Sequence, residues 1–463
     1  MCRTVFRFIM SDLAKIKKKF DTYEKLEEAR QRTTLNLTAS ENFVSKYVRS
    51  AMASMFANKY SEGRPLKRYY GGHEVIDPME LEVEELARKV FKADGYRVNV
   101  QAYSGSPANF ACYCGVVEYI ARLKKKQTGT LPSFHDIVRE TVFLGMKLDQ
   151  GGHLTQGNIP SMTGRIFNFI HYGVNRQTYR IDTGNIRELV AKHRPKLITI
   201  GPSSYSRALN EFEELAKIAH DAGALFMADI AHTSGLVAAG VQPSPFPHAD
   251  IVTMTTHKTL RGPRGALIFV RESKKFDSGE KNKKGESIFI SLADQIDKAV
   301  FPGLQGGPHD HQTYAIGKAL IEVLDQKFKK YASEIIKNTK RLADALAKKG
   351  FTVISGGTEN HLLVIDLRSK GLSGKEAEDH LSAVGIVANR NAIPFDPAPP
   401  WNPSGLRLGC AALTTRGMKE KEMETVAELI GRTLLSCGDE NLTKKNQSDI
   451  SKKVIALCKK FRV

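Results

Sequence analysis

The sequence contains no apolar run that approaches the roughly 20 residues of a membrane-spanning helix. It also shows no internal repeat and no low-complexity tract. Its six cysteines are scattered, and Cys112 with Cys114 forms a C-x-C pair without a second pair. A metal site is therefore not expected, and the cysteines are expected to be reduced cytosolic thiols. The chain of 463 residues is expected to be soluble and long enough for a large domain and a smaller one.

The N-terminal stretch MCRTVFRFIM is basic and apolar, but it lacks the full hydrophobic region and the small-residue cleavage site of a secretory signal. A transit-peptide remnant stays open, although serine is scarce. An upstream start codon, with Met10 rather than Met1 as the functional start, is the plainer alternative. The residues after Met10, SDLAKIKKKF, are predicted to form the first helix.

Positive charge is in excess, with 69 Lys and Arg against 50 Asp and Glu and a net charge of +19. The surplus lies in short lysine-rich runs at 17–19, 124–126, 281–284, 329–330 and 452–453. These runs lack interleaved aromatic residues, so they are typical of solvated helix faces and loops rather than of a nucleic-acid surface. Their field can steer anionic ligands, and a weak RNA affinity at low salt stays open.

The segment TMTTHKTLRGPR at 253–264 places Lys258 behind small hydroxyl residues and His257, and before a Gly-Pro break. Most lysines of the chain are expected on the solvated surface. Lys258 instead follows a β-rich run and lies at a strand end, where desolvation would lower its pKa. Imine chemistry requires such a lysine, and hydroxyls such as Thr255 can hold a phosphate.

The apolar run FMADIAH at 226–232 carries Asp229 and His232 three residues apart. Asp229 alone is equally typical of a helix N-cap or a turn. Together with Lys258, in two consecutive strand-turn units, these residues match a pyridoxal-phosphate (PLP) site. There a lysine forms the Schiff base and a carboxylate pairs with the pyridinium nitrogen.

Ordered motifs over most of the chain resemble those of serine hydroxymethyltransferase, a fold-type I PLP enzyme. They are LTASEN at 37–42, NKYSEG at 58–63, KRYYGG at 67–72, YSGSPAN at 103–109, GGHLTQG at 151–157, THKTLRGPR at 256–264, FPGLQGGPH at 301–309, SGGTENH at 355–361 and LRLG at 406–409. The set is far more specific than any one motif. It implies an α/β, PLP-dependent transferase fold of type I, with a mostly parallel seven-stranded type of sheet flanked by helices and a smaller α+β C-terminal domain.

The order of elements agrees with this resemblance. Short β-rich segments such as 194–201 and 224–230 flank a helical pattern, and this alternation predicts βαβ units and a largely parallel sheet. The segment YEKLEEARQR at 23–32 predicts an amphipathic helix, and the lysine-rich stretch 278–287 is expected to be an exposed loop. The expected division is N-terminal helices and an arm (1–50), a large PLP-binding domain (51–310) and a small C-terminal domain (311–463).

The resemblance implies a transferase of one-carbon metabolism that uses PLP as a Schiff base on Lys258. It would interconvert serine and tetrahydrofolate with glycine and 5,10-methylenetetrahydrofolate, with 3-hydroxy amino acid aldolase activity on the side. The resemblance also implies a cytoplasmic homodimer, with a tetramer left open, whose active sites are shared across the interface. No metal, membrane or nucleic-acid partner is expected.

Site residues are carried over by motif. Ser104 to Ser106 form a small-residue turn before a helix, suited to a phosphate, although an ordinary strand-helix turn has the same look. The cofactor set is Ser104, Gly105, Ser106, His153, Ser203, Asp229, His232, Thr255, Lys258, Gly306 and Gly307. The catalytic set is Lys258, Glu62, Tyr70, His153, Asp229 and His257.

The substrate carboxylate is expected on Arg407, whose fork a lysine would not replace, with help from Ser40. Glu62 and Tyr70 would be an acid/base pair near the serine hydroxyl, and Tyr60 would come from the partner subunit. Folate is expected at Tyr69, Leu148, Gly152, His153, Leu154, Phe301, Asn391 and Trp401. Trp401, the only tryptophan, could equally anchor a proline-rich loop.

Several positions depart from the family pattern: Arg64 and Leu66 in place of the Tyr and Gly of Y-P-G, Gln150 and Gln156 in place of two His, Asp310 in place of Asn, Cys410 in place of Thr, and Ala102 and Ala411 in place of Pro. None removes an assigned catalytic group, but several are expected near the folate mouth or the dimer seam, where they would affect folate use rather than PLP binding. Two alternatives therefore stay open. One is a PLP aldolase without efficient folate transfer, and the other is a PLP-bound protein that mainly binds RNA or a partner enzyme.

Overall fold

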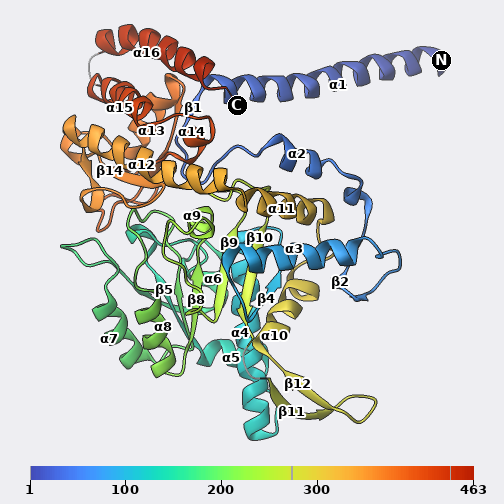
Figure 1. Cartoon of the computed structure of the whole chain (residues 1–463). Helices are drawn as coiled ribbons and strands as arrows, with labels where there is room; N and C mark the ends of the chain where they lie inside the picture. The colour runs from blue at the N-terminus through green and yellow to red at the C-terminus, as the bar shows by residue number, and fades with distance from the viewer. Residues whose placement is uncertain (1, 273–274, 438–439, 463) are drawn as a thin grey trace.

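The computed structural model describes residues 2–272, 275–437 and 440–462. Its centre is a seven-stranded sheet with the order β4-β10-β9-β8-β7-β5-β6 (Figure 1). The strands are β4 (Tyr96–Asn99), β5 (Val142–Met146), β6 (Asn168–Tyr172), β7 (Leu197–Ile200), β8 (Leu225–Asp229), β9 (Ile251–Thr255) and β10 (Ala266–Arg271). The run from β9 to β6 is parallel, and β10 is antiparallel to both β9 and β4. The predicted fold class is confirmed.

The two faces of this sheet bury alternate residues of each strand. In β10, Ala266 and Ile268 pack on one side, while Leu267 and Phe269 pack on the other, because successive strand side chains point to opposite faces. Helices cover both faces, which explains why a strand such as β7 is apolar throughout. One face carries α4 (Gly105–Thr128), α5 (Phe134–Glu140) and α10 (Leu292–Lys298), and the other carries α3 (Ile76–Phe91), α7 (Thr183–His193), α8 (Phe212–Asp221), α9 (Ser234–Ala238) and α11 (Asp310–Val323).

A second core surrounds a four-stranded sheet near the C-terminus, with the order β13-β14-β17-β16. Its elements are α12 (Gln326–Lys348), β13 (Thr352–Val353), β14 (Leu362–Asp366), α13 (Gly374–Ala383), β16 (Asn389–Asn391), β17 (Gly405–Gly409), α14 (Ala411–Thr415), α15 (Glu420–Leu435) and α16 (Glu440–Lys460). The N-terminal segment joins this core, because β1 (Leu35–Asn36) pairs with β15 (Ile386–Val387). Leu35 and Leu37 are fully buried there.

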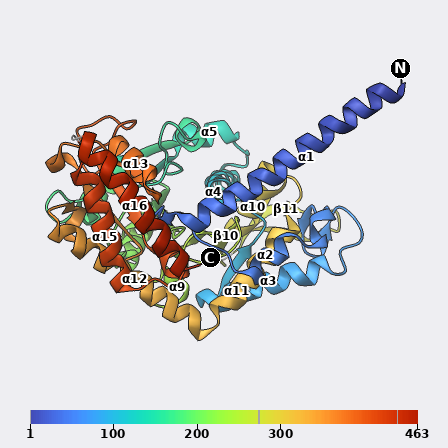
Figure 2. The same ribbon diagram turned by 90° about the horizontal axis from the view of Figure 1, so that it is seen from above.

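Two elements project from the body of the molecule (Figures 1 and 2). One is α1 (Cys2–Thr33), which includes both helical segments expected near the N-terminus. The other is a hairpin of β11 (Phe276–Lys281) and β12 (Ser287–Ile290). The prediction of a loop at 278–287 was wrong, because the Asn282 N–H bonds to the Glu286 carbonyl at 2.9 Å and closes a tight turn between two strands. Within the described parts of the chain, no helix is long and apolar enough to cross a membrane.

The carboxyl ends of β7, β8 and β9 lie side by side at one edge of the large sheet. The chain that leaves these ends carries Ser203, Asp229 and Lys258. Helix α4 begins against the same edge, since a Cβ added to Gly105 would lie 2.7 Å from Cγ2 of Thr255. Parallel α/β sheets bind their ligands at this edge.

Candidate active site

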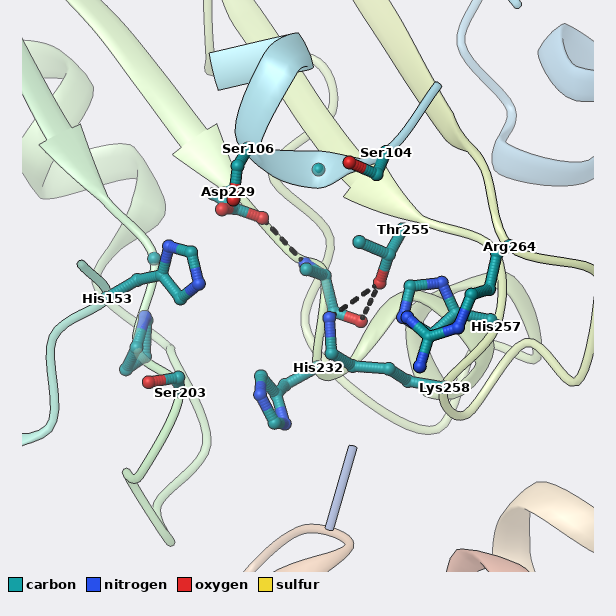
Figure 3. Close-up of a pocket in the computed structure, with 14 residues that line it drawn as sticks. Ser104, Ser106, His153, Ser203, Asp229, His232, Thr255, His257, Lys258 and Arg264 are labelled. Carbon is teal, nitrogen blue, oxygen red and sulfur yellow. Dashed lines mark hydrogen bonds between the residues drawn. The ribbon is translucent and has the colours of Figure 1, made fainter. Parts of the chain in front are cut away.

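A cavity of about 180 Å³ opens at this edge (Figure 3). It is lined by Ser104, Gly105, Ser106, His153, Gly201, Pro202, Ser203, Asp229, Ala231, His232, Thr255, His257, Lys258 and Arg264. Of the cofactor residues predicted from the sequence, only Gly306 and Gly307 are outside this set. Arg264 lines the cavity although the sequence analysis assigned it no role.

Lys258 is buried, and its Nζ donates a hydrogen bond to Thr255 Oγ1 at 2.8 Å. The pKa of Lys258 is lowered to about 8, mainly by burial; the Asp229 carboxylate opposes this shift, and Arg407 and Arg264 contribute to it. Only the neutral amine is a nucleophile, so this pKa makes Lys258 reactive toward an aldehyde near neutral pH.

A buried hydrogen-bond network fixes the Asp229 carboxylate. Its Oδ2 accepts from Asn109 Nδ2 at 2.8 Å, and its Oδ1 accepts from the Ala231 N–H at 2.9 Å. Asn109 also donates to Thr155 Oγ1 at 2.9 Å and accepts from Thr253 Oγ1 at 2.7 Å. Asn109 therefore joins α4 to the ends of two strands. Sequence analysis missed its role because only the fold brings α4 beside β8.

Three histidines around the cavity are held in the neutral form. Burial is the main cause in each case: the pKa of His257 falls to about 3, and the pKa values of His153 and His232 are also lowered. His153 Nδ1 lies 2.7 Å from Thr155 Oγ1, and His232 Nδ1 lies 3.1 Å from His361 Nε2. Neutral imidazoles can stack on a ring and exchange single hydrogen bonds with it.

One end of the cavity is suited to a phosphate. Ser104 is the N-cap of the 24-residue helix α4, and its side chain makes no capping bond. The free N–H groups and the dipole of a helix N-terminus attract an anion. On the other side, His257 Nδ1 is buried and has no hydrogen-bond partner within the described residues. A phosphate oxygen would supply that partner, so the residues present fit the phosphate of PLP.

Arg407 of β17, in the C-terminal part of the chain, lies beside the cavity, because it contacts Ser203, which lines the cavity. Its Nη1 donates to the Ser203 carbonyl at 2.7 Å, and burial lowers its pKa to about 10. No carboxylate of the described residues pairs with this guanidinium, which leaves it free to bind the carboxylate of a ligand. Ser40 follows a segment that packs on the end of β17, since the Gly409 N–H bonds to the Leu37 carbonyl at 2.7 Å.

The predicted acid/base residues form a separate cluster outside the cavity. Tyr60 donates to Glu62 Oε1 at 3.3 Å, and the rings of Tyr60 and Tyr70 meet edge to face with centroids 5.6 Å apart. The Glu62 carboxylate raises the pKa of the exposed Tyr70. A Cβ added to Gly306 would lie 3.5 Å from Glu62 Oε1, and one added to Gly307 would lie 3.6 Å from the Tyr60 ring. Among the described residues, none of these five lines the Lys258 cavity.

The predicted folate residues divide between these two places. Tyr69 and Phe301 meet edge to face at 5.6 Å beside the Glu62 cluster. On the cavity side, the Gly152 carbonyl accepts from Ser203 Oγ at 2.9 Å, in the same loop as Leu148 and Leu154. Asn391 also lies on the cavity side, because Ser204 Oγ donates a hydrogen bond to Asn391 Oδ1 at 2.7 Å. Trp401 is 76% exposed.

The two glutamines that depart from the family pattern are buried beside the cavity. Gln156 accepts from the Met146 N–H at 2.9 Å and donates to the Gly201 carbonyl at 2.6 Å, so it joins the ends of β5 and β7. Gln150 accepts from the Val174 N–H at 2.8 Å. Both side chains hold the loops of the site in place.

Arg64, Leu66 and Asp310 lie within or against the segment that carries Glu62, since Asp310 Oδ1 accepts from Ser61 Oγ at 2.7 Å, whereas Cys410 belongs to the core of the C-terminal sheet. Arg64, in β2 (Gly63–Arg64), pairs with the buried Glu84 at 2.8 Å. Leu66 has φ 64° and is 79% exposed, a conformation that glycine would adopt without strain. Asp310 and Cys410 are buried.

Comparison with known proteins agrees with this geometry. Residues 13–430 match the profile of a family described as serine hydroxymethyltransferase. The chain is also similar to the serine hydroxymethyltransferase of Rippkaea orientalis (strain PCC 8801 / RF-1). The two are 45% identical over 435 residues, which covers 94% of this chain and 92% of that protein.

Proposed function

The chain belongs to the serine hydroxymethyltransferase family, and from that premise we propose that two copies of it build each active site together. The reaction is the interconversion of serine and tetrahydrofolate with glycine and 5,10-methylenetetrahydrofolate, and the cofactor is PLP. When bound, PLP supplies the electron sink for the bond that breaks at the α-carbon of the amino acid. The rest of the chemistry depends on how the chain places its own groups.

In this proposal the Lys258 cavity supplies the cofactor half of the site. Lys258 would anchor PLP, and Asp229, fixed by Asn109, would bond to the ring nitrogen. His153 would stack on the ring, while Ser203 and His232 would hold its edge. The phosphate would bind at the start of α4, with Thr255 and His257 beside it. Arg407 and Ser40 would bind the carboxylate of serine or glycine.

The partner subunit would supply the second half of the site. One observation carries this part of the proposal: Tyr60, Glu62 and Tyr70 lie together on Gly306 and Gly307, outside the cavity that holds Lys258. Groups that lie outside the cavity cannot transfer a proton directly to a ligand inside it. A two-fold dimer would bring them to the cavity of the other copy, because a two-fold interface exchanges the same surfaces in both directions.

Glu62 and Tyr70 of the partner subunit would then hold and move the proton of the serine hydroxyl. The partner subunit's Gly306 and Gly307 would approach the phosphate. Folate would bind between the partner subunit's Tyr69 and Phe301 on one side and Leu148, Leu154 and Asn391 on the other, with Gly152 and His153 at the base and Trp401 at the rim.

Mixing two inactive variants tests this proposal. Lys258→Ala and Glu62→Gln are unfolded together and refolded at equal concentrations. A shared site predicts that mixed dimers hold one intact site, which restores about a quarter of the wild-type activity. The matched control mixes Lys258→Ala with Asp229→Ala. Both defects then lie in the same half of the site, so no activity should return. If the first mixture also stays inactive although mixed dimers form, the shared site is wrong.

We also propose a division into N-terminal helices and an arm (1–50), a PLP-binding domain (51–310) and a C-terminal domain (311–463). Separate apolar cores on the large sheet and on the C-terminal sheet support a division into two domains, and α11 with the first half of α12 packs on the core of the large sheet. A cytoplasmic location is part of the proposal. Cys112, Cys114, Cys410, Cys437 and Cys458 are free thiols, and three of them (Cys112, Cys410 and Cys458) are buried, as suits a reducing compartment.

A further inference from the structure

A second cavity, of about 370 Å³, lies where the N-terminal segment meets α14 and the end of α16. It is lined by Glu28, Gln31, Arg32, Phe43, Val44, Ser45, Lys46, Arg49, Arg261, Thr415, Arg416 and Arg462. Six of these residues are cations and only one, Glu28, is an acid. The cavity shares no lining residue with the one that holds Lys258.

Two of the six cations already have partners in the chain. Arg32 pairs with Glu28 at 2.6 Å. Arg416 is buried and donates to the carbonyls at the C-terminal ends of two helices: Gln31, Arg32 and Thr34 at the end of α1, and Cys458 and Phe461 at the end of α16. The positive charge of Arg416 is compensated by these carbonyls, which lie at the negative ends of the helix dipoles.

The other four cations are poorly neutralised. Arg261 stacks on the Tyr331 ring at 4.7 Å and lies 3.6 Å from Glu322, but its buried Nε has no hydrogen-bond partner. Lys46, Arg49 and Arg462 form no ion pair with any of the described residues. Because like charges in a concave site repel one another, this cavity favours an anion.

We propose that this cavity is a binding site for a small polyanion of the phosphate class, held by Lys46, Arg49, Arg261 and Arg462. The guanidinium fork binds phosphate oxygens in pairs, and an oxygen near Arg261 would satisfy the buried Nε. A concave space of this size, built from five separate segments of the chain, suits a compact anion rather than a polymer.

Such an anion would be coupled to the Lys258 loop. The Arg261 N–H donates to the Lys258 carbonyl at 3.0 Å. The same carbonyl accepts from Asn42 Nδ2 at 2.9 Å, and Asn42 accepts from Thr415 Oγ1 at 2.7 Å. An anion bound to Arg261 and to Lys46 would therefore tie the back of this loop to the N-terminal segment. The site is distinct from the phosphate site of PLP.

The test uses the protein saturated with PLP, so that its own phosphate site is filled. Inorganic phosphate is titrated at constant ionic strength, and binding is followed by calorimetry and by the thermal unfolding midpoint. We expect saturable binding with a rise in the midpoint. The double variant Lys46→Gln/Arg49→Gln should need at least tenfold more phosphate. Both side chains are exposed, so the variant should fold. The control Lys17→Gln/Lys18→Gln removes the same charge from α1 and should bind as the wild type does.

Three results would overturn the proposal. A midpoint that rises without saturation, or equally in all variants, would mean general charge screening. Loss of bound PLP absorbance in proportion to phosphate would place the anion in the Lys258 cavity. Tighter binding of a short single-stranded RNA, lost in the same double variant, would assign the cations to a polymer rather than to a small anion.

Discussion

Replacing Lys258 by Met should stabilise the protein without PLP while abolishing activity. Burial lowers the pKa of Lys258 from 10.5 to about 8. In the unfolded chain the amine keeps its ordinary pKa, so below pH 8 the folded state binds this proton less favourably. Each pKa unit corresponds to about 1.4 kcal/mol, which makes the cost about 3 kcal/mol. Methionine has a similar length and no charge, but it loses the hydrogen bond to Thr255, worth about 1 kcal/mol. The net gain should be about 2 kcal/mol.

The direction of the pKa shift of Lys258 determines the pH range in which the variant gains stability. The cost is fully present below the folded pKa of about 8 and disappears as the pH rises toward 10.5. The assay is urea unfolding of the wild type and Lys258→Met, both freed of PLP, at one protein concentration and at pH 7, 8, 9 and 10. The difference in the free energy of unfolding should favour the variant at pH 7 and shrink by pH 10. A variant that is less stable at pH 7, or a difference that does not change with pH, would refute the claim that burial lowers the pKa of Lys258.

Three further predictions follow from other parts of the structure. Asn109→Ala should weaken PLP binding at least tenfold, because a hydrogen bond to a carboxylate contributes about 1.5–3 kcal/mol; a titration followed by the absorbance of bound PLP measures it, and an unchanged affinity would contradict the role of Asn109. Arg407→Lys should raise the KM for serine ten- to hundredfold through loss of the paired contacts, and should leave PLP affinity unchanged; steady-state kinetics would refute it if KM stayed constant. Burial raises the pKa of Glu84 from 4.5 to about 7, even beside Arg64. The folded state therefore binds this proton more tightly than the unfolded chain does, and the stability that the proton contributes is lost as the pH rises from 4.5 to 7. Stability relative to Glu84→Gln should therefore fall between pH 5 and pH 8 in urea unfolding, and parallel curves for the two proteins would count against it.

Local sequence patterns predicted the positions of most residues around the Lys258 cavity. Continuous apolar runs before Asp229 and Lys258 predict buried parallel strands, and the residues that follow such strands meet at one edge of the sheet. Lys258, Asp229 and the N-terminus of α4 could all be placed at this edge in this way. Each depends on a strand or helix end, which has a clear signal in the sequence.

The rest of the site depends on contacts between distant segments, which no local pattern encodes. Asn109 lies 120 positions from Asp229, and His361 lies 129 positions from His232. Among Tyr60, Glu62 and Tyr70, the family resemblance implied a partner-subunit role for Tyr60 only, and no spacing in the sequence predicts that Glu62 lies outside the cavity of its own chain. The hairpin at 276–290 was missed because its charged residues look like those of a loop, although a turn at Gly285 pairs its two strands.

The most direct test of the account follows the carbon that leaves serine. Protein saturated with PLP is incubated with serine labelled at its β-carbon, with and without tetrahydrofolate, and glycine and labelled 5,10-methylenetetrahydrofolate are measured together. The account predicts equal amounts of the two products, both dependent on tetrahydrofolate and both absent from Lys258→Ala. Glycine formed equally fast without tetrahydrofolate, with the label released as formaldehyde, would contradict it.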